Sequence, residues 1–433
     1  MLSIQPYKGA RDFYPEDKRI QKYMFNVLRS VVEQYGYEEY DSPVLESLDL
    51  YKAKSGQEIV NEQTYNFVDR GGRSVAIRPE MTPSVSRMVA GRRQELAYPA
   101  RWYSIPNLWR YERPQKGRLR EHWQLNVDVF GIESEHAEVE LIQIADSIFR
   151  TFGASPDQYA IKVNSRKFVD YLFHDFFKLN KESAHKVIKL VDRMHKLETI
   201  KFESSLREII AESKLESVVA DEIITILKVK NIEYLPLPVR AHESLISLES
   251  LMNHLKNIGI TNCFFDISLM RGFDYYTDIV FEVFDTNPEN KRSIMGGGRY
   301  DGLVGLFGVN PVSTVGFGLG DVVLLDFLNT HGLLPKIEVE TDVYLIVLGN
   351  NFTYASGVAS DLRKQGVNVA VDSSGKKVGQ LIKNALKKKI PYVIFIGDNE
   401  ASNKKIVLRR LADNHETEEE VSSASKEILD NKQ

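Results

Sequence analysis

The chain has 433 residues with ordinary globular proportions of hydrophobic (43%) and charged (27%) residues, which excludes a disordered or fibrous chain and suggests about two to four domains. The net charge of −4 argues against a globally basic nucleic-acid binder, and the single cysteine, Cys263, excludes an intrachain disulfide and a cysteine-based metal cluster. No run of about 18 apolar residues is present and the first residues are charged, so we expect a soluble, cytoplasmic protein.

The first motif in chain order is RPEMTPS, Arg78 to Ser84, in which two prolines fix an extended path. Glu80 and Thr82 are two residues apart, so on a strand they would point to the same side. An ionised carboxylate beside a hydroxyl can hold an ammonium group. A surface salt bridge is the alternative interpretation, and this motif alone does not decide between them.

The second motif, WRYERPQKGRLREHWQLNVDVFG, runs from Trp109 to Gly131 and predicts a strand, a basic loop and a returning strand. Its basic residues are Arg110, Arg113, Lys116, Arg118 and Arg120. A loop this basic suits a polyphosphate, although a solvated surface loop is the alternative. Strand alternation places Gln124, Asn126 and Asp128 on one face of the returning strand, which suits a small polar ligand.

A long stretch without glycine or proline follows. No glycine occurs between Gly153 and Gly259, and no proline occurs over 157–235. Within it, apolar residues recur at i, i+3, i+4 and i+7, which is the period of an amphipathic helix. The sequence therefore predicts an all-helical segment over 164–258.

The flanking parts, 1–163 and 259–330, are rich in glycine, proline, arginine and aromatic residues. They contain short strand-like runs such as Cys263–Ile267 and Ile279–Phe284. We therefore expect one mixed α/β core that is interrupted by the helical segment.

Two further motifs follow in the second part of this core. In DISLMRGFDYYTDIVFEVF, Asp266 to Phe284, Arg271 lies between two strand-like runs and is followed by Tyr275 and Tyr276. In GGGRYDGLVGLFG, Gly296 to Gly308, the glycines allow a backbone to approach a ligand closely. Their spacing does not match a Walker loop or a dinucleotide-binding fingerprint.

A change of pattern near Pro335 separates a linker, 331–339, from a C-terminal part, 340–433. There, strands and helices alternate, which predicts βαβ units and a mostly parallel sheet. Residues 340–412 hold twelve Lys/Arg against six Asp/Glu, a local charge of +6 that indicates either a solvated surface or a phosphate-facing patch. The acidic, serine-rich tail after Asp413 is expected to be frayed or loosely helical.

The four motifs, in this order and spacing, resemble the histidyl-tRNA synthetase family of class II aminoacyl-tRNA synthetases. The resemblance covers essentially the whole chain, from KGARDFYPED and SPVLES, which are similar to the dimer-forming first class II motif, to a C-terminal domain similar to an anticodon-binding domain. RGFDYYT is the most specific piece. The resemblance implies an α+β catalytic core with an antiparallel sheet, a helical insertion and a C-terminal mixed α/β domain.

The resemblance implies a histidine–tRNA ligase, which activates L-histidine with ATP to histidyl-adenylate and pyrophosphate and then transfers histidine to tRNA(His). It further implies Mg²⁺ as the companion of ATP, no protein-held metal site, and a homodimer. The alternative is a non-catalytic regulatory subunit of ATP phosphoribosyltransferase, which keeps the fold but typically lacks the C-terminal domain. The presence of 340–412, Arg110 and Arg271 favours the enzyme, and a purely tRNA-binding or structural protein is favoured least.

The resemblance also implies roles for single residues. The histidine pocket would consist of Glu80, Thr82, Gln124, Asp128, Tyr275, Tyr276 and Tyr300. Within it, Asp128 and Tyr276 would contact the two imidazole nitrogens, and Glu80, Thr82 and Gln124 would hold the α-ammonium group.

For ATP, the resemblance implies that Arg110 and Arg271 hold the α-phosphate, and that Arg118 and His122 lie near the triphosphate and adenine. The chain departs from the family pattern at one position of this site. Val323 stands where the third class II motif usually ends in an arginine that binds the γ-phosphate. Either another basic residue, Arg118 or Arg120, takes over this role, or the use of ATP is compromised. At the histidine pocket, Asp128 is one methylene shorter than the glutamate that is common in the family.

Overall fold

The computed structural model divides the chain into two units, 1–334 and 335–433. The residues that the structure describes are 2–52, 63–194, 197–270, 275–290 and 292–432. Among these, no helix combines the length and the apolar character that a membrane span requires.

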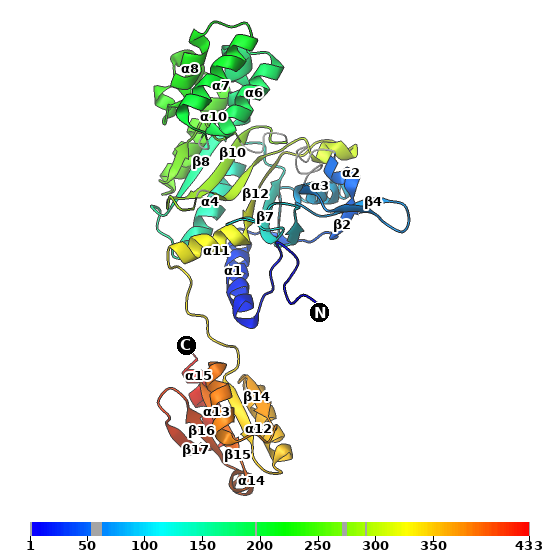
Figure 1. Ribbon diagram of the computed structural model, residues 1–433, viewed down its shortest axis with the longest axis vertical. Coiled ribbons are helices and arrows are strands. Elements are labelled where there is room, and N and C mark those ends of the chain that lie inside the picture. Colours follow the sequence, from blue (N-terminus) through cyan, green and yellow to red (C-terminus); the bar gives the residue numbers. More distant parts are fainter. Residues whose placement is uncertain (1, 53–62, 195–196, 271–274, 291, 433) are drawn as a thin grey trace. The chain divides into compact units, whose positions relative to one another are not determined.

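The first unit is built on a nine-stranded sheet (Figure 1). Its strands, in spatial order, are β1 (Glu38–Glu39), β5 (Ala100–Ser104), β7 (Glu121–Phe130), β12 (Thr314–Gly320), β11 (Ser293–Arg299), β10 (Ile279–Asp285), β8 (Tyr159–Ser165) and β9 (Cys263–Phe265), with β6 (Asn107–Trp109) paired to the start of β7. The pairs are antiparallel except β1–β5 and β8–β9. The prediction of an antiparallel sheet in an α+β core is therefore confirmed.

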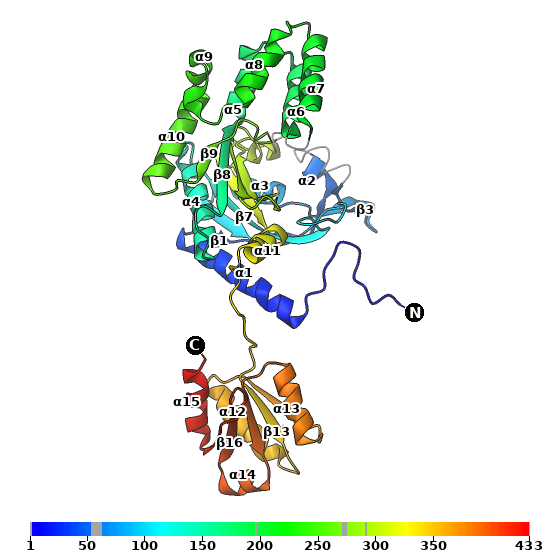
Figure 2. The same cartoon turned by 60° about the vertical axis from the view of Figure 1, so that its left-hand side comes forward.

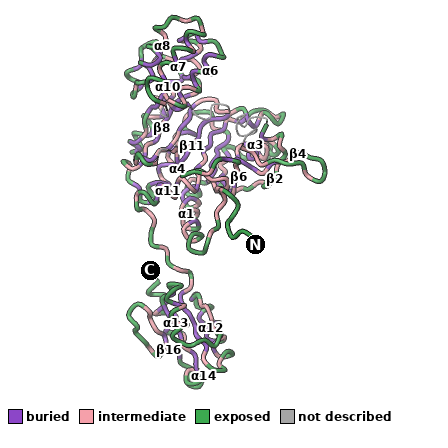
Figure 3. The backbone as a smooth tube through the Cα atoms, viewed as in Figure 1, coloured by how far each residue is buried: buried purple, intermediate pink, exposed green. Residues whose placement is uncertain are grey.

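One face of this sheet is covered by helices that contribute to a common apolar core. These helices are α1 (Pro15–Gln34), α4 (His136–Thr151), α10 (Glu243–Asn257) and α11 (Asp321–Thr330). In α1 the buried Met24, Leu28, Val31 and Val32 recur at helical spacing, so one stripe of the helix is apolar. Figure 3 shows the resulting pattern, in which the strands are largely buried and the outer turns are exposed.

The first unit also contains a small, separate three-stranded sheet. It consists of β2 (Leu45–Ser47), β4 (Ser74–Ile77) and β3 (Asn66–Val68), with the helices α2 (Leu48–Lys52) and α3 (Thr82–Gly91) beside it. The start of α3 matters for the site, because the RPEMTPS motif ends in its first turn.

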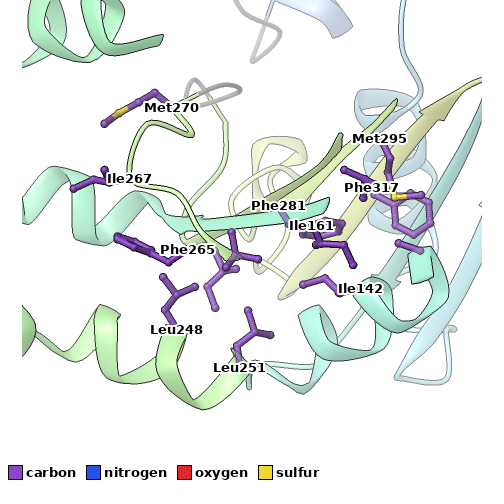
Figure 4. Packing of buried hydrophobic residues seen from close by; sticks show 14 of the residues in the cluster. Ile142, Ile161, Leu248, Leu251, Phe265, Ile267, Met270, Phe281, Met295 and Phe317 are labelled. Atoms are coloured by element: carbon purple, nitrogen blue, oxygen red, sulfur yellow. The ribbon is translucent and has the colours of Figure 1, made fainter. Parts of the chain in front are cut away.

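In the segment predicted to be helical, every regular element of the described residues after β8 is helical. It contains α5 (Arg166–Asp170), a π-helical turn (Tyr171–Phe176), α6 (Lys181–Asp192), α7 (Thr199–Glu212), α8 (Val218–Leu227), a 3₁₀ turn (Ile232–Tyr234), α9 (Leu237–Arg240) and α10. Figure 2 shows α6, α7, α8 and α9 at one end of the first unit, whereas α10 runs back beside the sheet near α4. The segment leaves the sheet after β8 and returns through β9 beside it, and its core is continuous with that of the sheet. Figure 4 shows Leu248 and Leu251 of α10 among the strand side chains Ile161 and Phe265.

The second unit has its own five-stranded sheet. Its strand order is β14 (Val369–Asp372), β13 (Val343–Val347), β15 (Tyr392–Ile396), β16 (Ile406–Arg410) and β17 (Glu416–Glu419), and its helices are α12 (Phe352–Lys364), α13 (Val378–Lys387), α14 (Asp398–Asn403) and α15 (Val421–Asp430). The three strands β14, β13 and β15 are parallel, as predicted, and β16 and β17 extend the sheet in antiparallel fashion. Separate apolar clusters lie on the two faces of this sheet.

The tail after Asp413 was expected to be frayed or loosely helical; a helix is present, but the tail is ordered and not frayed. The tail forms the edge strand β17 and the helix α15. Ala424 and Ile428, four residues apart, are fully buried against α12 and the sheet, and Arg410 pairs with Glu427 at 2.9 Å. Two apolar contacts at helical spacing and an ion pair therefore order a segment whose overall composition is polar.

Candidate active site

The site depends on the alternation of side chains between the two faces of β7. Leu125, Val127 and Val129 point into the core, whereas Gln124, Asn126 and Asp128 line a cavity on the opposite face. The alternation predicted for this strand is therefore present. The polar residues are next to β12, and β11 follows on its other side; both strands are rich in glycine.

The first cavity, here called the β7 cavity, has a volume of about 190 Å³. Seven residues that the sequence assigned to a histidine pocket line it together: Glu80, Thr82, Gln124, Asp128, Tyr275, Tyr276 and Tyr300. They come from the segment that enters α3, from β7, from the segment before β10 and from the residue directly after β11. The lining is polar, with two carboxylates, two amides and several hydroxyl groups.

Glycine on β12 makes room for the polar side chains of β7. A Cβ atom at Gly316 would lie 2.1 Å from Oδ1 of Asp128, and one at Gly318 would lie 2.2 Å from Nε2 of Gln124. Real Cβ atoms do not approach other atoms so closely, so any larger residue would displace these side chains. The floor of the β7 cavity is thus formed by backbone alone, and we call Gly316 and Gly318 the glycine floor.

Asp128 is the most unusual group in this cavity. It is 3% exposed, and the hydroxyl of Tyr300 donates a hydrogen bond to its Oδ1. Burial raises the pKa of Asp128 to about 7, and the Tyr300 hydrogen bond opposes this shift. Oδ2 of Asp128 has no hydrogen-bond partner among the described residues. A buried acceptor of this kind is suited to an N–H donor of a ligand.

Glu80 and Thr82 reach the cavity by a route that differs from the expected strand. Glu80 lies in the turn before α3, and Thr82 is the first residue of that helix. Pro83 at the second helical position favours a helix start because proline needs no intrahelical donor there. The two side chains share the cavity because a tight turn directs them there, and not because a strand alternates.

The second cavity, here called the loop cavity, has a volume of about 180 Å³ and adjoins the first. Its lining includes Arg110, Glu112, Arg118 and His122 from the basic motif. Arg110, Gln124, Gly296 and Gly318 line both cavities. Arg110 is held in place by its Nε, which donates to the carbonyl of Pro79 at 2.9 Å.

The electrostatics of the loop cavity favour an anion. Nε of Arg118 lies 2.6 Å from the carboxylate of the buried Glu112. Burial, and then the positive charges of Arg110, Arg11 and Arg118, lower the pKa of His122 to about 3, so its ring is neutral at pH 7. A neutral imidazole between arginines can donate or accept a hydrogen bond without adding charge.

Three residues of the sequence motifs differ in their relation to the two cavities. Arg271 lies outside the described residues. Arg120 does not line either cavity, because its guanidinium stacks over the ring of Tyr111 at 4.1 Å and donates to the Tyr7 hydroxyl at 3.1 Å. Val323 lines the loop cavity, as expected of a residue at the end of the third motif.

Sequence reasoning missed two charged residues near the loop cavity. Glu112, in the middle of RYERP, is the partner of Arg118, and its place inside the basic motif was the available signal. Arg292 directly precedes β11, and its signal was its position four residues before the glycine run. In the described part of the chain, no group of three or more His, Cys, Asp or Glu side chains could hold a metal ion.

Comparisons with known proteins identify the family of the chain. Residues 9–320 match the histidyl-tRNA synthetase family, and residues 342–431 match the anticodon binding domain family. A curated relative named histidine–tRNA ligase, from Leptospira biflexa serovar Patoc, is 42% identical over 429 residues, which is 99% of this chain and 98% of the relative.

Two solved structures share the fold at 22% identity. The crystal structure of histidyl-tRNA synthetase from Nostoc sp. PCC 7120 aligns with a TM-score of 0.82 over 99% of this chain and 100% of that chain. A structure from Bacillus halodurans C described as an ATP phosphoribosyltransferase regulatory subunit/histidyl-tRNA synthetase aligns with a TM-score of 0.75 over 91% of this chain and 98% of that chain. The family match over most of the chain and the 42% identity together show that the chain belongs to the histidyl-tRNA synthetase family.

Proposed function

We infer that the two adjoining cavities are the reaction centre of a histidine–tRNA ligase, with histidine in the β7 cavity and ATP in the loop cavity. The chain is an aminoacyl-tRNA synthetase that uses ATP to activate histidine and then charges tRNA. The observation that carries the assignment of the cavities is the position of Arg110, which lines both of them. The side chain of Arg110 at this junction would therefore contact the atoms between which the amino acid and the nucleotide become joined.

In the β7 cavity, Asp128 would accept an N–H of the imidazole ring through Oδ2, and the hydroxyl of Tyr276 would contact the other ring nitrogen. Glu80, Thr82 and Gln124 would hold the α-ammonium group. Tyr300 would keep Asp128 in its orientation, and Tyr275 would close the wall beside Tyr276. An analogue without ring nitrogens would leave buried polar atoms unpaired, which is a strong basis for rejection.

In the loop cavity, Arg110 would contact the α-phosphate, and Arg118 and His122 would lie along the triphosphate and the adenine. By the sequence resemblance, Arg271 would act beside Arg110. Mg²⁺ bound to ATP is usually held by phosphate oxygens with one or two carboxylates. Glu112 is the carboxylate among the described lining residues and would hold it, and the ion would neutralise phosphate charge.

The first step then needs no general base. The histidine carboxylate attacks the α-phosphorus in line, the bond to the bridging oxygen breaks, and pyrophosphate leaves with the electron pair. Catalysis consists of holding both reactants at the Arg110 junction and stabilising charge on the phosphoryl oxygens. An arginine-rich cavity without a base next to the carboxylate fits this chemistry.

The alternative, a regulatory subunit of ATP phosphoribosyltransferase, shares the fold, so fold similarity does not separate the two. Two features favour the ligase: the cavities retain their polar lining, and a complete second unit matches the anticodon binding domain family. Histidine-dependent exchange of pyrophosphate into ATP, followed by charging of tRNA(His), tests the assignment. A protein that binds histidine but shows neither reaction would support the regulatory alternative.

We also propose that the enzyme is a cytoplasmic homodimer. The dimer is suggested by the segments 8–17 and 42–47, which resemble the first class II motif. A symmetric dimer would double the mass of 49.5 kDa in light scattering.

The second unit is proposed to bind the anticodon region of tRNA. A truncation after Lys336 should keep pyrophosphate exchange, because the first unit has its own core, and should lose tRNA charging by at least about tenfold, the expected effect of losing a few charge-assisted phosphate contacts. Kinetics of both reactions with the same preparation provide the measurement.

A second, full-length variant tests the same proposal without a truncation. It carries Lys376→Glu and Lys377→Glu, two exposed positions of the basic region. It should weaken charging in a salt-dependent manner while exchange stays normal. Equal charging by truncated and full-length proteins would exclude a role of the second unit in tRNA recognition.

A further inference from the structure

We propose that residues 7–13, the segment before α1, act as a strap that positions the basic loop, residues 110–120, at the loop cavity. The inference rests on the proposed function of this cavity. None of the residues 7–13 is buried, so the strap adds little to the apolar core. Its contacts are directed instead to the base of the basic loop and to α11, and they identify Gly9 and Arg11 as its two fixed points.

The first fixed point is Gly9. Its carbonyl accepts hydrogen bonds from the backbone N–H groups of Arg120, at 2.9 Å, and Glu121, at 3.2 Å. Arg120 also closes the base of the loop, because its own carbonyl accepts from the N–H of Arg110 at 2.8 Å. Gly9 has a φ of +85°, and a Cβ atom there would lie 2.8 Å from Cγ of Arg120 and 3.0 Å from Cγ of Pro114. The strap therefore lies directly against the loop base, at a position that leaves room for glycine alone.

The second fixed point is Arg11, which connects β7 to α11. Its Nη2 lies 2.7 Å from Oδ2 of the buried Asp321, and Oδ1 of the same carboxylate accepts from the backbone N–H of Trp123 at 3.0 Å. The Arg11 guanidinium also lies over the ring of Phe13, which packs edge to face on the Trp123 ring. The two fixed points thus hold the chain on both sides of His122, whose side chain lines the loop cavity.

Like charges oppose the compact arrangement of the basic loop. Arg113, Lys116 and Arg118 are exposed side chains of the same charge and repel one another. The tip of the loop is closed by a pair of backbone hydrogen bonds between Gln115 and Arg118. Attachment of the loop base from outside limits where Arg118 and His122 stand in the cavity. A displacement of about 1 Å in such groups can lower a rate by about 10²-fold.

The test uses two matched pairs of full-length variants. Gly9→Ala is compared with Gly36→Ala, because Gly36 has a similar φ of +79° but no atom of the described residues within 4 Å of its Cβ position. Both substitutions strain the backbone, and only Gly9→Ala also pushes against the loop. Arg11→Ala is compared with Arg101→Ala, which breaks another half-buried ion pair. Arg11→Lys and the double variant Arg11→Ala/Asp321→Asn complete the set.

Two readouts are measured on each variant. The first is the kinetics of pyrophosphate exchange with varied ATP and histidine. The second is the rate of tryptic cleavage after Lys116 and Arg118, two exposed positions of the loop, which reports opening of the loop and needs no activity. Melting temperature and mass by light scattering are recorded in parallel.

Gly9→Ala and Arg11→Ala should lower kcat/KM for ATP about 10- to 100-fold and speed cleavage of the loop by at least about fivefold. The KM for histidine should change less than about threefold, because the contacts of the strap end at Trp123, before the part of β7 that lines the β7 cavity. Gly36→Ala and Arg101→Ala should match the wild type in both readouts. Arg11→Lys should recover part of the loss, since an ammonium group still pairs with a carboxylate.

The double variant separates positioning from stability. Burial raises the pKa of Asp321, and the charge of Arg11 opposes this shift, so Arg11→Ala leaves a buried carboxylate without its cation. Adding Asp321→Asn removes that charge and should restore the melting temperature. The value of kcat/KM for ATP should nevertheless stay low, because the strap remains detached from α11.

The inference would be overturned if Gly9→Ala and Gly36→Ala had the same loop cleavage and the same ATP kinetics. Recovery of kcat/KM together with the melting temperature in the double variant would also overturn it, because Arg11 would then be a structural ion-pair residue. A halving of the mass in Gly9→Ala would overturn it too, by assigning the segment to the subunit contact. A wild-type protein without exchange activity would count against the proposed function instead, and the cleavage rates would still decide whether the strap holds the loop.

Discussion

Replacing Arg110 with alanine should lower kcat for histidine-dependent pyrophosphate exchange by about 10²–10³, the typical loss when one donor to a charged transition state is removed. The reason is its position: Arg110 lines both cavities and is fixed by its hydrogen bond to Pro79, so its guanidinium is already oriented. The KM for histidine should change much less. The measurement is steady-state exchange with varied ATP and histidine.

Arg110→Lys should recover only a minor part of the activity, because an ammonium group cannot reproduce the planar fork. A structural control is Arg101→Ala, which breaks the ion pair with Glu140 at 2.8 Å and should lower the melting temperature with little effect on kcat. The reverse result for Arg110→Ala, a large drop in melting temperature at near-normal kcat, would show that Arg110 is a structural residue.

Asp128→Ala should raise the KM for histidine about 10- to 150-fold, because it removes a charge-assisted hydrogen bond from a buried pocket, worth about 1.5–3 kcal/mol. Asp128→Asn should also weaken binding, since its amide offers a different pattern of donors and acceptors. The KM for ATP serves as the internal control and should stay near the wild-type value. An unchanged KM for histidine in Asp128→Ala would exclude Asp128 from the histidine pocket.

The same residue predicts a pH dependence. Burial raises the pKa of Asp128 to about 7, and a ligand N–H is best accepted by the ionised form. The value of kcat/KM for histidine should therefore fall as the pH drops below about 7, and this component should vanish in Asp128→Asn. Titration of free histidine near pH 6.5 would persist in both proteins.

The raised pKa of Asp128 also makes the free energy of unfolding depend on pH. The folded chain keeps a proton on Asp128 between about pH 4 and pH 7, where the unfolded chain has lost it. The contribution of this group to the free energy of unfolding is thus largest at low pH and is lost as the pH rises through about 7. Chemical denaturation of the wild type and of Asp128→Asn at several pH values measures the difference.

The sequence predicted those parts of the fold that depend on local periodicity. The alternation in β7, the helices between 164 and 258 and the βαβ order of the second unit follow from spacings of two or three to four residues. The helix at Thr82 was missed because the two prolines suggested an extended path, and the order of the tail was missed because two buried contacts in α15 outweigh a polar composition.

The candidate site can likewise be divided into residues that the sequence pointed to and residues that only the folded arrangement brings together. Family resemblance brought together residues from separate motifs, and these do line common cavities. Arg292 was missed because its proximity to Gly117 depends on how β11, β12 and β7 are ordered in the sheet, and no spacing along the chain contains that information. The space over Gly316 likewise depends on the pairing register of β12 with β7.

The glycine floor has a consequence for redesigning the amino-acid specificity of this enzyme. Gly316 and Gly318 have no side chain to trim, so no substitution at these two positions can deepen the β7 cavity. Alanine at Gly316 or Gly318 would only make it shallower and push Asp128 or Gln124 aside. A variant that accepts a bulkier amino acid would have to gain its volume from the walls, at β7 and the tyrosines, which are the groups that we propose to bind histidine. Enlarging the pocket and abandoning histidine are therefore the same engineering step.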